Sequence, residues 1–193
     1  MSIDVEDVSS LGLSAVETEA NRCFNCGCVA VNSSDIAPAL IALDAKIKTT
    51  KRVIEAEKFF TVEGDKTTVL DDDEIVTEIE VRRPTAGTKS KFTKFALRKA
   101  IDFPIVNCAA AIESEGGVVK AARICLNAVY NKPYRTIKAE EYIRGKSIDD
   151  SSAEGAANAA ITDACPLTNN RYKIQIAKTL VKRAILACNS RRT

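Results

Sequence analysis

The most constraining feature of this 193-residue sequence is a series of three strand-length apolar runs between residues 105 and 130. The runs cover residues 105–112, 118–124 and 124–130. Gly116 and Gly117 lie between the first two runs, and glycine tolerates the positive φ that a tight hairpin turn demands. The pattern predicts a three-stranded antiparallel meander on which the rest of the chain packs.

Helical periodicity appears on both sides of this meander. Apolar residues recur every three or four positions in residues 36–48, with Ser34 or Asp35 as the N-cap, and again in residues 172–188. We expect the last of these helices to cover one face of the meander. Two further helices are predicted at 137–143 and 153–164, and short strands at 51–56, 67–70 and 75–81. The fold class predicted from this pattern is α+β.

The composition excludes several classes of function. The 28 basic and 26 acidic side chains leave a net charge of only +2, so we expect neither nucleic acid nor an anionic membrane as a partner. No apolar run approaches the roughly 20 residues of a membrane span. The sequence has no histidine, which excludes mechanisms that need imidazole. Seven cysteines without a signal-peptide pattern favour a reducing, cytoplasmic location.

Cys23, Cys26 and Cys28 carry the sequence pattern that most resembles a metal site. The CxxC spacing allows two sulfurs to reach one ion or one iron of an iron–sulfur cluster, but no fourth ligand lies nearby. The pattern favours reduced structural thiols in a turn. The alternatives are ligation within this chain and a ligand set that another domain completes.

Two other polar stretches have a functional and a structural interpretation. Ser34 and Asp35 precede a helix whose free N–H groups suit an anion or a ribose, but capping alone explains these residue types. The acidic run at residues 71–74 resembles a divalent-cation site, but adjacent carboxylates in a turn usually face water. We expect the acidic run to be solvated.

Three stretches together resemble one family, and they read NSSDIAPALIALDA, TTVLDDDEIVTEIEV and KFTKFALRKAIDFPIVNCAA. The resemblance is to the flavin-binding subunit of the xanthine dehydrogenase and carbon monoxide dehydrogenase group, over about residues 29–187. It implies a vanillyl-alcohol-oxidase-type FAD fold with two α/β subdomains, followed by a three-stranded antiparallel sheet packed against C-terminal helices. The implied parts are a Cys-rich leading segment (1–28), part of the second FAD subdomain (29–84) and the C-terminal domain (90–193).

The resemblance also implies cofactor-binding residues. Ser34 and Asp35 match the segment near the adenosine part of FAD, and Lys94 matches a basic residue at the flavin end. Leu70 and Val76 match aliphatic positions that enclose the cofactor. Each has a structural alternative: Asp35 as a cap, Leu70 and Val76 as core, Lys94 as a solvated charge.

The sequence departs from the family before residue 29. The first FAD subdomain, with its glycine-rich pyrophosphate loop, has no counterpart there, and EANRCFNCGC instead resembles cysteine segments near the pyridine-nucleotide domain of glutamate synthase small-subunit-like proteins. We therefore expect a C-terminal piece of a fused oxidoreductase, with a stand-alone gene product as the alternative. The implied partners are an upstream pyridine-nucleotide or flavin domain, or other oxidoreductase subunits; homo-oligomerisation stays open.

Two functions follow from these expectations. In the first, FAD in the intact protein relays electrons from a reduced centre to an acceptor such as a nicotinamide, and the protein supplies position and electrostatics. The alternative is a non-catalytic docking module that has lost FAD binding. No residue is a convincing acid, base or nucleophile, so no catalytic residue is predicted. We expect the chain alone to be inactive and to bind FAD weakly or not at all.

Overall fold

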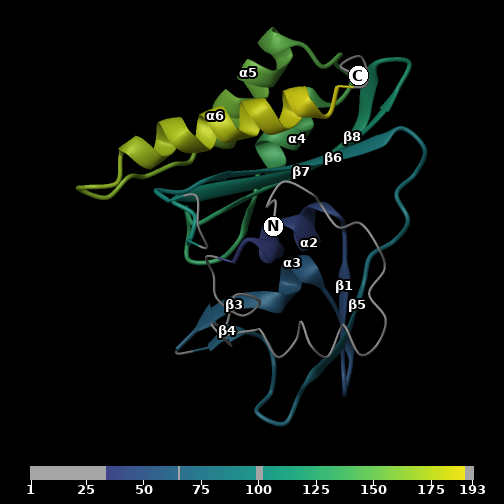
Figure 1. The fold of residues 1–193 in the computed structure, drawn as a ribbon, viewed down its shortest axis with the longest axis vertical. Coiled ribbons are helices and arrows are strands. Elements are labelled where there is room, and N and C mark those ends of the chain that lie inside the picture. Colours follow the sequence, from purple (N-terminus) through teal and green to yellow (C-terminus); the bar gives the residue numbers. More distant parts are fainter. Residues whose placement is uncertain (1–33, 65, 99–101, 190–193) are drawn as a thin grey trace, which may run out of the picture.

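The middle layer of the structure is a four-stranded antiparallel sheet (Figure 1). The computed structural model describes residues 34–64, 66–98 and 102–189. The strand order is β6-β7-β8-β9, and the strands are β6 (Thr88–Phe95), β7 (Val106–Glu115), β8 (Val118–Asn127) and β9 (Tyr134–Arg135). Most of β7 and the second half of β8 are buried, because elements pack on both faces of the sheet.

The β7–β8 hairpin confirms the predicted turn, but the rest of the meander differs. Gly116 and Gly117 have φ values of 59° and 84°, as a tight two-residue loop requires. Residues 124–127 continue β8 instead of starting a third strand, because no turn residue interrupts the run. The third long strand is β6, which pairs with the other edge of β7. It begins at Thr88, in the interval between the two predicted parts 29–84 and 90–193.

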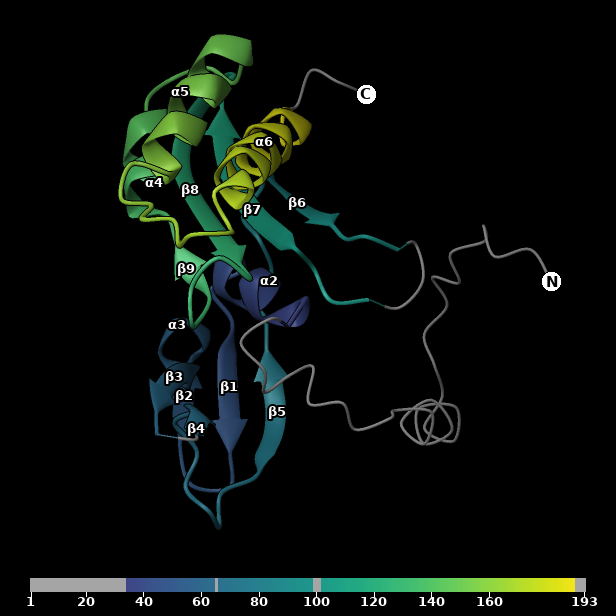
Figure 2. The ribbon, with the colours of Figure 1, turned by 90° about the vertical axis from the view of Figure 1, so that its left-hand side faces the viewer.

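Three helices cover one face of this sheet (Figures 1 and 2). They are α4 (Ile137–Ile143), α5 (Asp150–Ala160) and α6 (Tyr172–Ala187). The positions of α4 and α6 confirm the prediction, and α6 packs against β6 and β7 as expected. α5 begins at Asp150, before the predicted start at residue 153, because Asp149 and Ser152 form a capping box that includes the first turn.

The opposite face of the sheet contacts α2 (Ile36–Ala42), which lies between the sheet and the N-terminal half (Figure 2). That half contains β1 (Lys46–Thr49), β2 (Val53–Glu55), α3 (Ala56–Phe59), β3 (Phe60–Glu63), β4 (Lys66–Thr68) and β5 (Val76–Glu80). Its sheets have the orders β2-β1-β5 and β3-β4. A second apolar core joins α2 to Ile47, Phe59 and Phe60, and includes Cys125 of β8.

Helix α2 is shorter than the helix predicted at residues 36–48. It ends at Ala42, because Asp44 adopts a left-handed conformation with φ of 54° and the Ala45 amide donates to the Leu40 carbonyl at 2.9 Å. This is the hydrogen-bond pattern that commonly ends helices. The following residues, predicted as helix, form β1 instead.

β5 confirms a predicted strand but is less buried than its alternating pattern suggests. Ile79 is 40% exposed, since β5 forms an edge of its sheet. The α+β class is confirmed. Among the described residues, no helix is both long and apolar enough to cross a membrane.

Candidate functional site

The chain enters α2 through Ser34, which is buried and caps the helix. Its Oγ accepts hydrogen bonds from the amides of Ile36 at 3.1 Å and Ala37 at 3.2 Å. This satisfies two of the amides that have no partner within a helix. The Asp35 side chain makes no capping bond. Asp35 stands at the N-cap position without capping the helix through its side chain, so its carboxylate is available for other partners.

Asp35 and Lys94, which come from different halves of the chain, are in direct contact. The Lys94 ammonium lies 2.5 Å from Oδ2 of Asp35 and donates to the carbonyl oxygen of Asp102 at 2.6 Å. The Lys94 side chain is 26% exposed, so its charge is partly covered and is paired with Asp35. Two predicted site residues, 59 positions apart in sequence, thus form one ion pair.

Asp102 is held in turn by Arg98. The guanidinium donates to both carboxylate oxygens at 3.1 Å, and this bidentate contact lowers the pKa of Asp102 below its ordinary value. The Phe103 amide donates to the same carboxylate at 3.0 Å. This local pairing orients the Asp102 backbone toward Lys94.

Two asparagines, which the sequence analysis did not single out, complete the cluster from the sheet. Asn107 of β7 donates to Oδ1 of Asp35 at 2.8 Å and to the Ser34 carbonyl at 3.4 Å. Asn127 of β8 donates to the same carbonyl at 2.7 Å. Both side chains are fully buried. A sequence signal did exist, because each is a lone amide in an apolar strand, where a polar side chain needs a partner.

Leu70 and Val76 lie elsewhere, in the N-terminal half. Both are partly buried and pack against the second apolar core, which agrees with their structural alternative. The core that they contact contains neither Asp35 nor Lys94. The structure therefore brings together Ser34, Asp35 and Lys94, and leaves Leu70 and Val76 as a separate aliphatic pair. Their role as cofactor contacts stays a prediction.

Asp71, Asp72 and Asp73 of the acidic run are exposed, as predicted, but Glu74 is not. Glu74 is buried and accepts from the Thr49 hydroxyl at 2.6 Å and from the Arg52 guanidinium at 2.9 and 3.0 Å. These hydrogen bonds, that of Arg52 first, lower the pKa of Glu74 to about 2. The other three carboxylates pair with lysines: Asp71 and Asp73 with Lys51, and Asp72 with Lys66.

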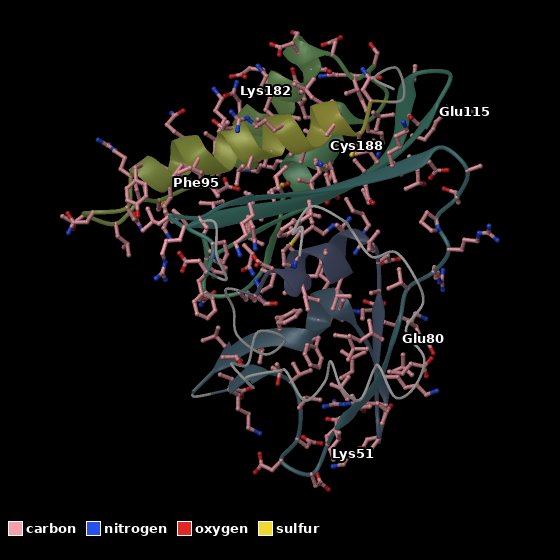
Figure 3. All side chains as sticks on the ribbon, in the orientation of Figure 1. Lys51, Glu80, Phe95, Glu115, Lys182 and Cys188 are labelled. Atoms are coloured by element: carbon pink, nitrogen blue, oxygen red, sulfur yellow. The ribbon has the colours of Figure 1, made fainter. Side chains whose placement is uncertain are left out.

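Two other features do not extend the site. Cys23, Cys26 and Cys28 lie outside the described residues, and residues 34–64, 66–98 and 102–189 hold no cluster of metal-ligating side chains. A groove along α6 (Figure 3, near Lys182) is lined by three basic side chains and by Glu154 of α5, which pairs with Lys178 at 2.6 Å and with Lys182 at 3.1 Å.

The cluster of Ser34, Asp35, Lys94, Asn107 and Asn127 offers both kinds of hydrogen-bonding group. The Asp35 carboxylate, 41% exposed, can accept from hydroxyl or N–H groups, and Lys94 can donate to carbonyl or phosphate oxygens. The amide oxygens of both asparagines have no partner within the described residues. No residue of the cluster has the geometry of a nucleophile with its base.

Sequence comparison identifies similar proteins with related roles. The chain is 28% identical over 160 residues to the glyceraldehyde dehydrogenase medium chain of Sulfolobus acidocaldarius, covering 79% of this chain and 56% of that protein. It is 30% identical over 145 residues to the carbon monoxide dehydrogenase medium chain of Hydrogenophaga pseudoflava, covering 73% and 50%. The chain thus spans about half the length of the curated relatives it matches.

Structure comparison leads to the same group. Carbon monoxide dehydrogenase from Hydrogenophaga pseudoflava, in a form that lacks the Mo-pyranopterin moiety of the molybdenum cofactor, matches with a TM-score of 0.77 and 28% identity over 88% of this chain and 63% of that chain. Residues 10–84 match the FAD binding domain in molybdopterin dehydrogenase, and residues 91–188 match the CO dehydrogenase flavoprotein C-terminal domain. The chain therefore belongs to the flavoprotein family of the carbon monoxide and xanthine dehydrogenases, as the sequence resemblance indicated.

Proposed function

We propose that this chain is part of the flavin-binding subunit of a multi-subunit dehydrogenase, and that the cluster around Asp35 and Lys94 contacts FAD. The observation that carries the proposal is the Asp35–Lys94 ion pair, since it joins one residue from each of the two family matches. FAD agrees with the family to which both matches belong.

The residues of the cluster fit FAD in their chemistry. FAD carries hydroxyl and N–H donors that a carboxylate or an amide oxygen accepts, and carbonyl and phosphate oxygens that an ammonium donates to. The unpartnered oxygens of Asn107 and Asn127 are buried acceptors, which favours a polar ligand nearby over a purely apolar one. Leu70 and Val76 would supply aliphatic surface to a ring system.

The residues of this chain would bind and orient the cofactor and take no covalent part in the reaction. Lys94 would place positive charge beside the ligand, and Asp35 would fix the position of that charge. FAD, when bound, supplies the transfer of electrons between a reduced centre and an acceptor. The relatives named above are medium chains, so we infer that other oxidoreductase subunits complete the enzyme.

Titration of FAD with the purified chain tests this assignment. We expect weak FAD binding, because the chain spans about half the length of its relatives. The test is therefore the difference in FAD affinity between the wild type and the variants. Asp35→Asn and Lys94→Met should each weaken binding by about tenfold, which is the size expected for one lost charge-assisted hydrogen bond. Lys91→Met, an exposed lysine on the same strand, is the matched control and should bind like the wild type.

Two results would contradict the proposal. Equal FAD affinity in all four proteins would place the cofactor contacts elsewhere in the chain. The alternative function, a docking module without FAD, predicts that no saturable binding occurs even when the chain is joined to the N-terminal half of a relative. Fluorescence quenching of FAD and equilibrium dialysis measure both outcomes.

A further inference from the structure

Two buried asparagines in the central sheet lower the free energy of unfolding, because their amide oxygens lack hydrogen-bond donors within the described part of the chain. Asn107 and Asn127 lie directly opposite one another in the β7–β8 register, and both are 0% exposed. Neither amide oxygen has a hydrogen-bond partner among the described residues. A buried acceptor without a donor loses its hydration and gains nothing in return.

The neighbours of the pair along their strands face the other side of the sheet. Val106, Cys108 and Leu126 belong to the apolar core beneath the helices, whereas the two amides face Ser34 and Asp35 at the start of α2. An apolar side chain would leave no unpaired oxygen at these positions. Stability of the sheet alone therefore does not explain why two asparagines occur there.

The donors of the pair indicate what the amides do. Both NH₂ groups point toward the start of α2, where they share the Ser34 carbonyl, and Asn107 also reaches Oδ1 of Asp35 at 2.8 Å. With Oδ1 held by Asn107, the other oxygen of the same carboxylate faces Lys94. The amide orientation is determined by these acceptors, because the amide oxygen cannot take the place of the NH₂ group beside a carboxylate.

We propose that Asn107 is a positioning residue of the flavin site, which acts through the Asp35 carboxylate on Lys94. Asn127 supports the same segment by holding the Ser34 carbonyl. This inference rests on the proposed function for its link to FAD, whereas the effect on Lys94 belongs to the protein without ligand. A neutral amide suits this role because it orients the Asp35 carboxylate, while Lys94 stays the cation that balances the carboxylate charge.

Replacement of Asn107 by valine in the full chain separates positioning from stability. In Asn107→Val the unpaired oxygen disappears, Ser34 keeps its bond from Asn127, and the partly exposed Asp35 can be hydrated. We expect the melting temperature to stay the same or rise. The ammonium resonance of Lys94, followed by ¹⁵N NMR in protein without ligand, should shift and exchange faster with water because Asp35 is no longer held.

Thr93→Val is the control, since it removes a side-chain hydrogen bond to the Cys108 carbonyl beside Lys94 without touching Asp35 or Ser34. It should leave the Lys94 resonance close to that of the wild type. If Asn107→Val does not fold, Asn107→Thr is measured in its place. An unchanged Lys94 resonance in the Asn107 variant would overturn the proposal. Equal shifts of the Lys94 resonance in both variants, together with lower melting temperatures, would also overturn it, because they would indicate a purely structural role.

FAD titration of the same proteins links the positioning role to the ligand. Asn107→Val should weaken FAD binding by about tenfold relative to Thr93→Val, similar to the loss of one hydrogen bond to a charged group. If the wild type binds no FAD, the proposed function fails, while the Lys94 resonance still decides whether Asn107 positions the ion pair. If FAD binds equally to all variants while Lys94 shifts, the link to the flavin site is overturned.

Discussion

Asp35 and Glu74 illustrate, at the scale of single residues, that partners determine what a carboxylate does. Asp35 divides its two oxygens between Asn107 and Lys94 and stays partly exposed, so it remains able to contact a ligand. Glu74 is buried beneath Arg52 and accepts from the Asp71 amide at 3.1 Å, so it holds a loop together. Sequence position alone does not distinguish these roles.

The Glu74 network makes stability depend on pH. Its pKa falls from an ordinary 4.5 to about 2 in the folded protein, so the folded state binds fewer protons than the unfolded state between these values. The stabilisation is complete above about pH 4.5 and is lost as pH falls toward 2. Thermal melts of the wild type and Glu74→Gln should differ at neutral pH and converge over this interval. Glu78→Gln, at an exposed ion pair with Lys48, is the control and should melt like the wild type at every pH.

At the scale of elements, Glu140 ties α4 to the central sheet. Its buried carboxylate accepts from the Ile124 amide at 2.9 Å and from two guanidinium nitrogens of Arg135 at 2.8 and 2.9 Å. The contact with Glu140, followed by that with Glu57, raises the pKa of Arg135 above its ordinary value. α4 thus supplies the acceptor that the β8 backbone needs where β9 ends.

Removal of this carboxylate should loosen the attachment of α4. Glu140→Ala leaves the Ile124 amide and much of the Arg135 charge unpaired, so we expect a loss of about 2–3 kcal/mol in the free energy of unfolding. Glu141→Ala, which changes an exposed neighbour on the same helix, should cost little. Urea denaturation of the three proteins measures the difference. Equal stability of both variants would mean that α4 is held by its apolar contacts alone.

At the scale of the whole molecule, α2 is the connection between the two family matches. The Asn127 amide holds the Ser34 carbonyl at the start of the helix, and Arg123 of β8 donates to the Ile41 carbonyl near its end at 2.9 Å. Arg123 also pairs with Asp44 and Glu57. Cys125 of β8 belongs to the apolar core of the N-terminal half. The two halves therefore share polar contacts and one buried surface.

This shared interface predicts that both halves unfold in one transition. All four tyrosines lie in the C-terminal half, at positions 130, 134, 142 and 172, so tyrosine fluorescence follows that half alone. Hydrogen exchange of β1 and β5 follows the other half. The two probes should give the same midpoint. Arg123→Met, which keeps the aliphatic stem, should lower the free energy of unfolding by about 1–2 kcal/mol, and both probes should report the same loss. Separate midpoints in the wild type would contradict the shared interface.

Much of the local structure was predictable from the sequence, because neighbouring residues decide it. The Gly116–Gly117 turn, the bounds of α4 and the apolar stripe of α6 each depend on residues close in the chain. The predictions failed where a distant partner decides the outcome. β6 begins in the interval between the predicted parts 29–84 and 90–193 because it pairs with the edge of β7. Residues 46–49 form a strand because they pair with β2 and β5.

The candidate site divides along the same line. Motif resemblance predicted Ser34, Asp35 and Lys94 as cofactor contacts, and that role stays a prediction. Only the tertiary structure places Lys94 against Asp35 and adds Asn107 and Asn127 from the sheet. Residue types and their spacing determine turns, caps and amphipathic faces, because those interactions span a few residues. Pairing across the sheet, and with it the geometry of the site, depends on which distant segments the fold brings together.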